Sequence, residues 1–404
     1  MNQPDAVSVL ERRSPLPGDA RHVCRMLEGL THGWLLLSLP NGEMLSFGHH
    51  GEPVEMRVHD WSVFERVIAR GDIGLGEAYF DGLWDCDDLG RVLTLFAANR
   101  DVLEQAVHGN LLALALARVR HMLRANTRRG SRRNIMAHYD LGNDFYAQWL
   151  DPSMTYSSAL FEGDERRDLQ AAQRAKYRRI ARALRLTSSQ PVIEIGCGWG
   201  GFAEVAATEF GSPVHGITLS PAQLEWARER AQRGGFADRA SFELCDYRDL
   251  RGHVSRIVSI EMLEAVGERW WPTYFRKLHN LLTVGGEAMI QTISIADGLF
   301  SRYRRGTDFI QQYIFPGGML PSPSVFCAQA EKAGLAVREN HRFGIDYAIT
   351  LARWRERFDA RGDALRALGF DSPFQRLWRF YLAYCEAGFR AGSIDVHQFH
   401  LVKP

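Results

Sequence analysis

An α/β fold, Rossmann-like and joined to a smaller α+β N-terminal domain, is the fold class that this sequence predicts. Strand-like and helix-like segments alternate from about residue 190, a glycine turn follows the first of these strands, and short apolar runs separated by turn residues occupy residues 21–60. Alternation of strand and helix builds a parallel sheet with helices on both faces. The length of 404 residues allows two domains.

The first 117 residues are predicted to form the smaller, accessory domain. Residues 21–60 predict a few strands, and residues 61–123 predict mostly helices. The segment GDIGLGEAYFDGLWDCDDL at 71–89 has glycines spaced like a nucleotide-binding loop. No strong strand precedes it, so we predict that these glycines serve packing or turns.

A basic segment, RVRHMLRANTRRGSRR at 118–133, links this domain to the larger domain predicted at 134–404. It carries seven arginines and no acidic residue, and it follows the apolar run LLALALA. Such a segment suits an anionic membrane surface, and it equally suits a solvated linker. Nucleic acid is disfavoured, because this short run is the only basic feature.

The composition is that of a soluble globular protein. Lys+Arg 49 nearly balance Asp+Glu 48, and 46% of the residues are hydrophobic. The six cysteines are scattered, the charged N-terminus lacks a signal-peptide core, and no apolar run approaches the ~20 residues of a transmembrane helix. We predict a cytoplasmic protein that associates peripherally with the inner face of the membrane. A homodimer is left open.

The larger domain begins its alternation with the strand PVIEIG. Its predicted strands are 191–196, 213–219, 240–245, 254–260 and 287–295, and its predicted helices are 201–210, 221–235 and 270–286, the last two stopped by glycines.

The glycine turn after the first strand admits two ligands. Gly196, Gly198 and Gly201 satisfy the dinucleotide pattern. Glu194, however, would repel a pyrophosphate, and the second strand ends in GITLS without the acid that grips an adenosine ribose. A cationic adenosine ligand, S-adenosylmethionine, fits better, although Glu194 could also be a structural carboxylate.

Longer strings then carry a family resemblance. They are NIMAHYDLGNDFYAQWLDPSMTYSSALF, EIGCGWGGF, GITLSPAQ, CDYRDL, SIEMLEAVG, DFIQQYIFPGGMLPS and YCEAGFRAGSIDVHQFHL, in this order. Together they resemble the cyclopropane-fatty-acid synthase family over nearly all of 130–402. The N-terminal domain also looks like the accessory domain of bacterial members.

The resemblance implies a class I methyltransferase sheet and an S-adenosylmethionine-dependent enzyme. It would add a methylene across a cis double bond of an unsaturated phospholipid acyl chain. By the family pattern the cofactor site would be lined by Tyr139, Tyr156, Ser157, Glu194, Gly196, Cys197, Gly198, Gly200, Thr218, Leu219, Gln223, Asp246 and Tyr247. Thr218 and Gln223 would bond the ribose and adenine, while Asp246 could instead cap a helix.

The chemistry requires a dry, oriented alkene and stabilisation of a cation. Orientation lowers the barrier without an activated base, and aromatic faces stabilise positive charge. The aromatic candidates are Tyr139, Phe145, Tyr156, Trp199, Phe315 and Tyr347, of which Tyr156 and Tyr347 are preferred. The apolar segment 309–322, which also contains Pro and Gly turns, is predicted to be a lid over the acyl chain.

Ring closure requires a base. Family members use bicarbonate held by Cys, Glu, His and Tyr; Glu264 and Tyr347 match this set, but Ser158 and Gln291 replace the Cys and His. Both replacements can donate hydrogen bonds to an anion, yet bicarbonate is in doubt and Glu264 itself could be the base. Cyclopropanation is favoured over a methylene- or methyl-branched product.

The remaining candidates are weaker. Cys385 is interpreted as active-site wall or packing, because a thiolate would compete for the methyl group, and Cys197 is interpreted as packing. His138 could orient an acid or an ester, or be structural, and no metal-ligand spacing occurs. Two other functions stay open as alternatives, a silent lipid-binding module and a nicotinamide oxidoreductase.

Overall fold

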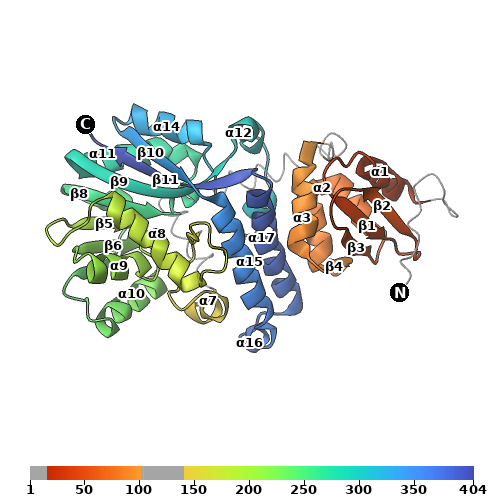
Figure 1. The fold of residues 1–404 in the computed structure, drawn as a ribbon, viewed down its shortest axis with the longest axis horizontal. Coiled ribbons are helices and arrows are strands. Elements are labelled where there is room, and N and C mark those ends of the chain that lie inside the picture. The colour runs from red at the N-terminus through yellow and green to blue at the C-terminus, as the bar shows by residue number, and fades with distance from the viewer. Residues whose placement is uncertain (1–15, 102, 104–140) are drawn as a thin grey trace.

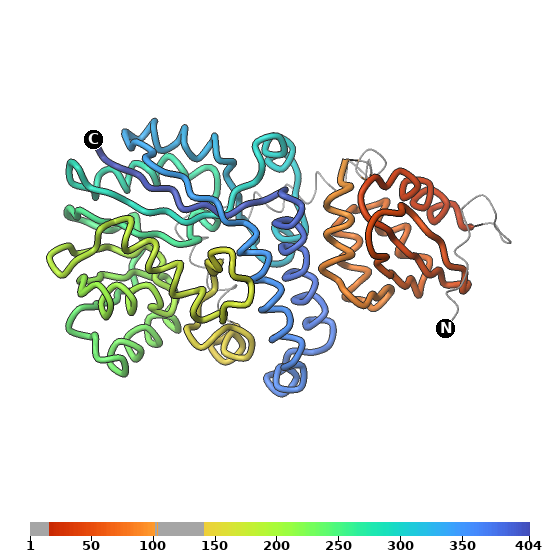
Figure 2. The backbone as a smooth tube through the Cα atoms, in the orientation of Figure 1, coloured from red at the N-terminus to blue at the C-terminus, as the bar shows by residue number. Residues whose placement is uncertain are grey.

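The computed structural model describes residues 16–101, 103 and 141–404 of the chain. An N-terminal unit, residues 16–103, lies beside a larger unit, residues 141–404 (Figure 1). The boundaries predicted at 117 and 133 lie outside the described residues. The tube in Figure 2 shows that the last long helices of the chain stand between the large sheet and the N-terminal unit.

The N-terminal unit is α+β, as predicted. Its four-stranded sheet has the order β2-β1-β3-β4, and three helices accompany it in the described part: β1 (Trp34–Ser38), β2 (Met44–Gly48), β3 (Val54–Val58), β4 (Trp84–Cys86), α1 (Gly18–Leu27), α2 (Ser62–Phe80) and α3 (Leu89–Ala98). Strand β1 alternates buried and half-buried residues, which is typical of a sheet with one covered face. Residues 21–27, predicted as part of a strand region, belong instead to α1.

Glycines of the 71–89 segment serve packing, the interpretation that the sequence favoured. Most of them lie inside α2, which kinks at Gly71, whose φ is 58°. A Cβ added to Gly76 would lie 2.7 Å from the ring of Phe309 in the larger unit. Helix α2 therefore needs a glycine where it meets that ring.

The larger unit contains a seven-stranded sheet of order β10-β11-β9-β8-β5-β6-β7. Its strands are β5 (Val192–Ile195), β6 (Val214–Thr218), β7 (Ala240–Leu244), β8 (Val254–Ile260), β9 (Leu282–Ile295), β10 (Ala336–Arg342) and β11 (Ile394–Val402). Strands β5 to β9 are mutually parallel, as predicted, and β11 is antiparallel to both of its neighbours. The sequence did not single out β10 and β11.

Helices cover both faces of this sheet (Figure 1). The described helices of the larger unit are α7 (Asn143–Trp149), α8 (Leu169–Ala183), α9 (Gly201–Glu209), α10 (Pro221–Arg233), α11 (Trp271–Leu281), α12 (Asp297–Tyr303), α13 (Phe309–Tyr313), α14 (Pro323–Lys332), α15 (Gly344–Asp359), α16 (Gly362–Ala367) and α17 (Ser372–Arg390). The sequence signals for α10 hold, because Ser220 caps its N-terminus, Pro221 occupies the first turn and Gly234 ends it. The predicted glycine stop of α11 was wrong, since residues 282–286 already belong to β9.

The sheet creates a crevice at the carboxyl end of β5. Strand β5 pairs with β6 on one side and with β8 on the other, so the chain order reverses there. Open α/β sheets bind ligands at this kind of reversal. In the described part of the chain, no helix is long and apolar enough to cross a bilayer.

Candidate active site

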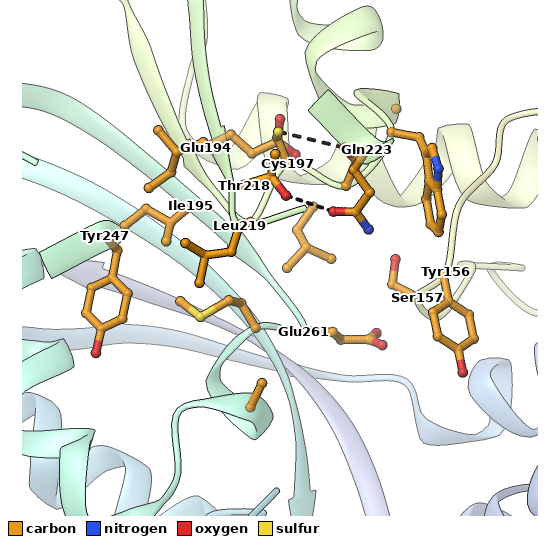
Figure 3. A pocket seen from close by; sticks show the side chains of 18 of the residues that line it. Tyr156, Ser157, Glu194, Ile195, Cys197, Thr218, Leu219, Gln223, Tyr247 and Glu261 are labelled. Carbon is orange, nitrogen blue, oxygen red and sulfur yellow. Dashed lines mark hydrogen bonds between the residues drawn. The ribbon is translucent and has the colours of Figure 1, made fainter. Parts of the chain in front are cut away.

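The glycine turn joins β5 to α9 at the crevice. Gly196, Gly198 and Gly200 all have positive φ, at 83°, 52° and 82°, a conformation that glycine adopts without strain. The turn borders a first pocket, together with residues that follow β6, β7 and β8 (Figure 3). Of the predicted cofactor residues with described positions, this pocket is lined by Tyr156, Ser157, Glu194, Gly196, Cys197, Gly198, Thr218, Leu219, Gln223, Asp246 and Tyr247. Gly200 lies behind the lining, at the N-cap of α9.

Glu194 brings a buried carboxylate to this pocket. The residue is 2% exposed, and its Oε2 atom has no hydrogen-bond partner. Burial raises the pKa of Glu194 well above its usual range, against the opposing charge of Lys176. A buried glutamate left in this state is suited to a cationic ligand group, because such a group would supply the missing partner and favour the ionised form of the side chain.

Polar groups on the far side of the pocket are partly engaged already. Thr218 Oγ1 donates to Gln223 Oε1 at 2.8 Å. Asp246 accepts from the backbone and the guanidinium of Arg248, at 2.9 and 2.8 Å, and caps a short helical turn. Asp246 lines the first pocket while both of its oxygens bond to Arg248, so its role toward the cofactor stays a prediction. Its capping role was the alternative from the sequence.

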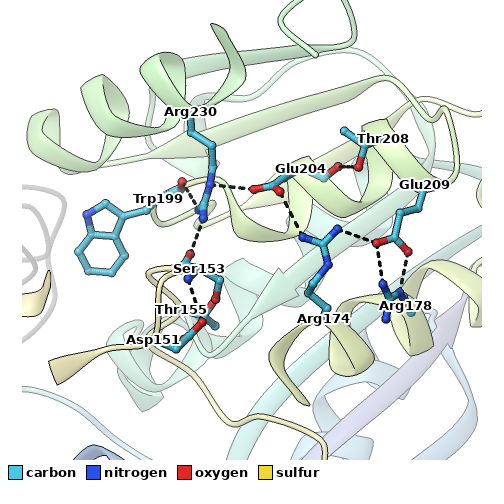
Figure 4. A network of polar contacts seen from close by, with 10 residues as sticks. All are labelled: Asp151, Ser153, Thr155, Arg174, Arg178, Trp199, Glu204, Thr208, Glu209 and Arg230. Carbon is cyan, nitrogen blue, oxygen red and sulfur yellow. Dashed lines mark hydrogen bonds and ion pairs between the residues drawn. The ribbon is translucent and has the colours of Figure 1, made fainter. Parts of the chain in front are cut away.

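An ionic network braces the turn from outside (Figure 4). Arg230 on α10 donates to the carbonyl oxygens of Trp199 at 2.9 Å and Ser153 at 2.7 Å, and it pairs with Glu204 of α9 at 2.9 Å. Arg174 on α8 also bonds to Glu204, at 3.2 Å. The sequence reading missed Arg230, since nothing in its local pattern shows that α10 reaches the glycine turn.

A second, larger cavity of about 720 Å³ opens next to the first. Its walls are mostly apolar, but they include the predicted residues Glu264, Tyr347 and Cys385. The predicted lid also lines it, through Ile310, Gln311, Phe315, Pro316, Gly318, Met319 and Leu320. Tyr156, Glu261 and Ala265 border both cavities.

Glu261 lines both cavities, and the sequence prediction did not include it. It lies at the end of β8, three residues before Glu264, and its φ is 50°. It accepts hydrogen bonds from the Ser158 backbone at 2.9 Å, from Gln291 Nε2 at 2.8 Å and from the Tyr347 hydroxyl at 2.6 Å. A non-glycine residue held with positive φ at a cleft is a mark of a functional position.

The expected roles of Ser158 and Gln291 are therefore corrected. Neither side chain lines a cavity; the Ser158 hydroxyl donates to the Ala159 carbonyl, and the Gln291 amide is held between Glu261 and Gln398. The Gln291 amide, which was expected to hold an anion, donates to the carboxylate of Glu261 instead, and at Ser158 it is the backbone N–H that donates to this carboxylate. The structure brings together Glu261, Ser158, Gln291 and Tyr347, while Glu264 lines the same cavity and accepts hydrogen bonds from Thr292 and Ile293.

Glu264 occupies a different environment. It accepts from Ile293 N at 2.5 Å and from Thr292 Oγ1 at 3.0 Å, and its Oε2 is buried without a partner. Burial, together with the charge of Glu261, raises the pKa of Glu264 to about 8. Glu264 is thus mainly protonated near neutral pH.

The raised pKa of Glu264 predicts a pH-dependent stability. Between the usual glutamate pKa of 4.5 and about 8, the folded protein keeps a proton that the unfolded chain has lost. The free energy of unfolding should therefore fall as pH rises through this window. Glu264→Gln removes this contribution, so its thermal midpoint should depend less on pH than that of the wild type. Parallel pH dependences in the two proteins would contradict a protonated Glu264.

Lys176 on α8 is a second residue that the sequence reading missed. It is fully buried, and its Nζ donates to Ser157 Oγ at 2.6 Å and to Gln173 Oε1 at 2.8 Å. Burial lowers the pKa of Lys176 to about 7, opposed by Glu261, Asp151 and Glu194. This cation lies behind the loop that forms one wall of both cavities. In the sequence Lys176 is a single lysine in an arginine-rich helix, and that pattern does not indicate a buried cation.

The aromatic candidates separate into three groups. Tyr156 borders both cavities and its hydroxyl lies 2.6 Å from that of Tyr381, while Phe315 and Tyr347 line the second cavity. Trp199 lines the first pocket. Phe145 lines neither: it is fully buried among other rings, so its candidacy is corrected.

The two candidate cysteines are both buried enough to have raised pKa values. Cys385 lines the second cavity, and burial raises the pKa of its thiol far above the usual range, which keeps it protonated. Burial also raises the pKa of Cys197. His138, Tyr139 and the basic segment 118–133 lie outside the described residues. Among the residues that are described, no His, Cys, Asp or Glu cluster suits a metal ion.

Comparison with known proteins gives concordant matches. The family described as Mycolic acid cyclopropane synthetase matches residues 126–399. Over 355 residues, 86% of this chain and 82% of the relative, the chain is 41% identical to tuberculostearic acid methyltransferase UfaA1 of Mycobacterium tuberculosis. It is 36% identical over 352 residues to the cyclopropane-fatty-acyl-phospholipid synthase of Escherichia coli, covering 86% of this chain and 87% of that one.

Solved structures agree with these matches. The cyclopropane synthase MmaA2 from Mycobacterium tuberculosis has a TM-score of 0.62 and 30% identity, covering 67% of this chain and 98% of that one. The mycolic acid cyclopropane synthase CmaA1, complexed with SAH and CTAB, also has a TM-score of 0.62, with 32% identity over 67% of this chain and 97% of that one.

Proposed function

From the premise that this chain belongs to the mycolic acid cyclopropane synthetase family of S-adenosylmethionine-dependent lipid methyltransferases, we propose that it methylates a cis double bond in an unsaturated phospholipid acyl chain. One observation carries the proposal. The pocket with the glycine turn and the large apolar cavity share Tyr156 and Glu261 as walls. A cationic cofactor in the first and an acyl chain in the second would meet beside a carboxylate.

The first pocket fits the cofactor. Glu194 would hold its cationic methionine end, since this buried carboxylate lacks a partner at Oε2. Thr218 and Gln223 would face its adenosine end. When bound, S-adenosylmethionine supplies an electrophilic methyl group on a positively charged sulfur.

The second cavity would orient the acyl chain, exclude water from its double bond and stabilise a cation on it. Its apolar walls exclude water from the double bond, which an uncharged alkene requires because it is a weak nucleophile. Methyl transfer leaves a positive charge on the acyl chain. The rings of Tyr156, Phe315 and Tyr347 line the walls where that charge would form, and aromatic faces stabilise cations.

We assign the base that removes a proton from the methylated chain to Glu261. Its carboxylate borders both cavities and receives three hydrogen bonds that favour its ionised form. Burial raises the pKa of Glu261, and Lys176 opposes this effect. A basic carboxylate kept ionised by donors and by a buried cation is suited to proton abstraction. A bicarbonate beside it would add a second negative charge, which this arrangement disfavours.

The site of deprotonation determines the product. Loss of a proton from the new methyl group closes a cyclopropane ring, whereas loss from a neighbouring chain carbon gives a methylene branch. Ring closure is the prediction from the sequence, and the Escherichia coli relative supports it. Two observations support the methylene-branched product as the second candidate. Ser158 and Gln291 donate hydrogen bonds to Glu261, and the chain is similar to tuberculostearic acid methyltransferase UfaA1 of Mycobacterium tuberculosis.

Mass spectrometry of host phospholipids with and without expression tests the proposal. The expected result is a gain of one methylene in monounsaturated chains. Ozonolysis then separates the products, because a ring resists cleavage and a methylene branch is cleaved. Unchanged lipids, in a host that supplies the cofactor, would instead support the lipid-binding module.

A further inference from the structure

Lys176 places a positive charge behind one wall of the first pocket. Its side chain is fully buried on α8, and no carboxylate of the described residues forms an ion pair with it. The Nζ atom donates to Ser157 Oγ at 2.6 Å and to Gln173 Oε1 at 2.8 Å, and it lies 4.4 Å from the centre of the Tyr177 ring. Burying a charge costs free energy, so a buried ammonium without an ion pair beside a pocket is a candidate for a role in that pocket.

The wall residue that Lys176 contacts is Ser157. This residue is buried, and its side chain lines the first pocket (Figure 3). Gln173 holds the same residue, because its Nε2 atom donates to the Ser157 carbonyl at 2.8 Å. Two side chains of α8 thus fix Ser157 from behind, one through its hydroxyl and one through its backbone.

The hydrogen bond from Lys176 makes the Ser157 hydroxyl a donor. An ammonium group has three N–H donors and no acceptor, so the Ser157 oxygen accepts from it. In the described part of the chain, no residue accepts a hydrogen bond from the Ser157 hydroxyl in return. A hydroxyl that accepts from a cation is also a stronger donor, because linked hydrogen bonds polarise one another. Ser157 therefore offers a strengthened donor at the wall of the first pocket.

The charge on Lys176 depends on the anions near it. Burial lowers the pKa of Lys176 to about 7, and the charges of Glu261, Asp151 and Glu194 oppose this effect. An anionic group bound at Ser157 would favour the ammonium form in the same way. The ammonium and an anion on the other side of Ser157 therefore stabilise each other.

The first pocket then presents two complementary polar groups. Glu194 has a buried, unpartnered oxygen that suits a cation, and Ser157 has a donor that suits an anion. Three N–H groups of the glycine turn, at Gly196, Cys197 and Gly200, already donate to backbone carbonyl oxygens, so these three do not supply the donor for the anion. An α-amino acid carries an ammonium and a carboxylate on the same carbon, and S-adenosylmethionine ends in such a group.

We propose that Lys176 is a positioning residue of the first pocket, which directs and strengthens the Ser157 hydroxyl so that it binds the carboxylate at the methionine end of S-adenosylmethionine. Glu194 holds the ammonium of the same end. This inference rests on the proposed placement of the cofactor in the first pocket and deepens it. The pocket is then selective for a cofactor with a complete α-amino acid end.

Four variants separate the charge, the hydroxyl and a general effect of losing a lysine. Lys176→Met and Lys176→Gln both remove the charge, one with an apolar and one with a polar side chain, so the test does not depend on the folding of either one alone. Ser157→Ala removes the hydroxyl and leaves the backbone contact with Gln173. Lys403→Met is the matched control, because Lys403 is a half-buried lysine that donates to two backbone carbonyls and lines neither cavity.

Isothermal titration calorimetry with S-adenosylmethionine and with its decarboxylated form tests the proposal. The decarboxylated form keeps the sulfonium and the amino group, so the ratio of the two affinities reports the carboxylate contact. Wild type and Lys403→Met should prefer S-adenosylmethionine by about 10- to 100-fold, the range for a charged hydrogen bond. The variants at Lys176 and Ser157 should lose most of that preference, and they should bind the decarboxylated form no more weakly than the wild type does.

Glu194→Gln distinguishes the two polar groups of the pocket. It should weaken both ligands alike, because both carry the amino group that Glu194 would hold.

An unchanged preference in the folded Lys176 variants would overturn the proposal. Equal weakening of both ligands in these variants would also overturn it, because that result indicates a structural role only. The proposed function fails separately, if the wild type binds neither ligand. Binding of both ligands by the wild type, with a preference that Lys176→Met and Lys176→Gln leave intact, would refute only the role of Lys176.

Discussion

Glu261→Gln is expected to lower kcat for lipid methylation by about 10² to 10⁴, the range that general acid–base catalysis contributes. The amide keeps the size of the side chain but cannot accept a proton from the methylated chain. It also turns one acceptor into a donor beside Ser158 N, Gln291 Nε2 and Tyr347 OH, which all donate to this position. The measurement is single-turnover transfer of labelled methyl groups to unsaturated phospholipid.

Two further measurements distinguish the loss of a base from the loss of cofactor binding. S-adenosylhomocysteine affinity should stay within a few-fold of the wild type, because that ligand lacks the sulfonium charge. Glu264→Gln should reduce kcat far less, since Glu264 is mainly protonated near neutral pH. If Glu264→Gln were the more damaging change, the base would be Glu264, the residue that the sequence indicated.

The rate of the wild type should also depend on pH in a defined direction. The pKa of Glu261 is raised by burial, so its basic form is populated only above the usual glutamate range. The kcat should therefore rise with pH through that raised pKa, and a rate that falls over the same interval would contradict proton abstraction by Glu261.

Glu194→Gln is expected to weaken S-adenosylmethionine binding by about 10- to 100-fold, the range for losing a charged hydrogen bond. Glu194 is the buried carboxylate of the first pocket with an unpartnered oxygen, and its neutral replacement cannot compensate a cationic ligand. Isothermal titration calorimetry measures the change.

Glu243→Gln is the control, because this exposed carboxylate lies on β7 of the same sheet and does not line the pocket. The cofactor should also raise the melting temperature of the wild type, whereas NAD should not. Undiminished binding in Glu194→Gln, or stabilisation by NAD, would refute the assignment of the first pocket.

Much of the site could be predicted because its signals are local. The run VIEI predicts a strand buried on both faces, and the glycines after it have the positive φ that glycine tolerates best. These features need only neighbouring residues, and the strand, the turn and α9 lie where the sequence placed them. The sequence also shows directly that this strand carries a carboxylate, at Glu194.

The remaining features depend on partners far away in the chain. The donors to Glu261 come from positions 158, 291 and 347, on a loop, on β9 and on α15. Arg230 reaches the glycine turn only because α10 packs beside it. Residues of both units line the second cavity, and no periodicity in either unit describes that contact.

By itself the sequence determined the family, the parallel sheet and the glycine turn with its carboxylate, because chain-local patterns encode each of these. Only the tertiary structure distinguishes the surroundings of Glu261 and Glu264, which follow the same strand three residues apart, and our proposal of Glu261 as the base rests on that difference. The physical reason is that a carboxylate's basicity depends on the donors and charges around it, and packing gathered three donors at Glu261 and left Glu264 to hold its proton.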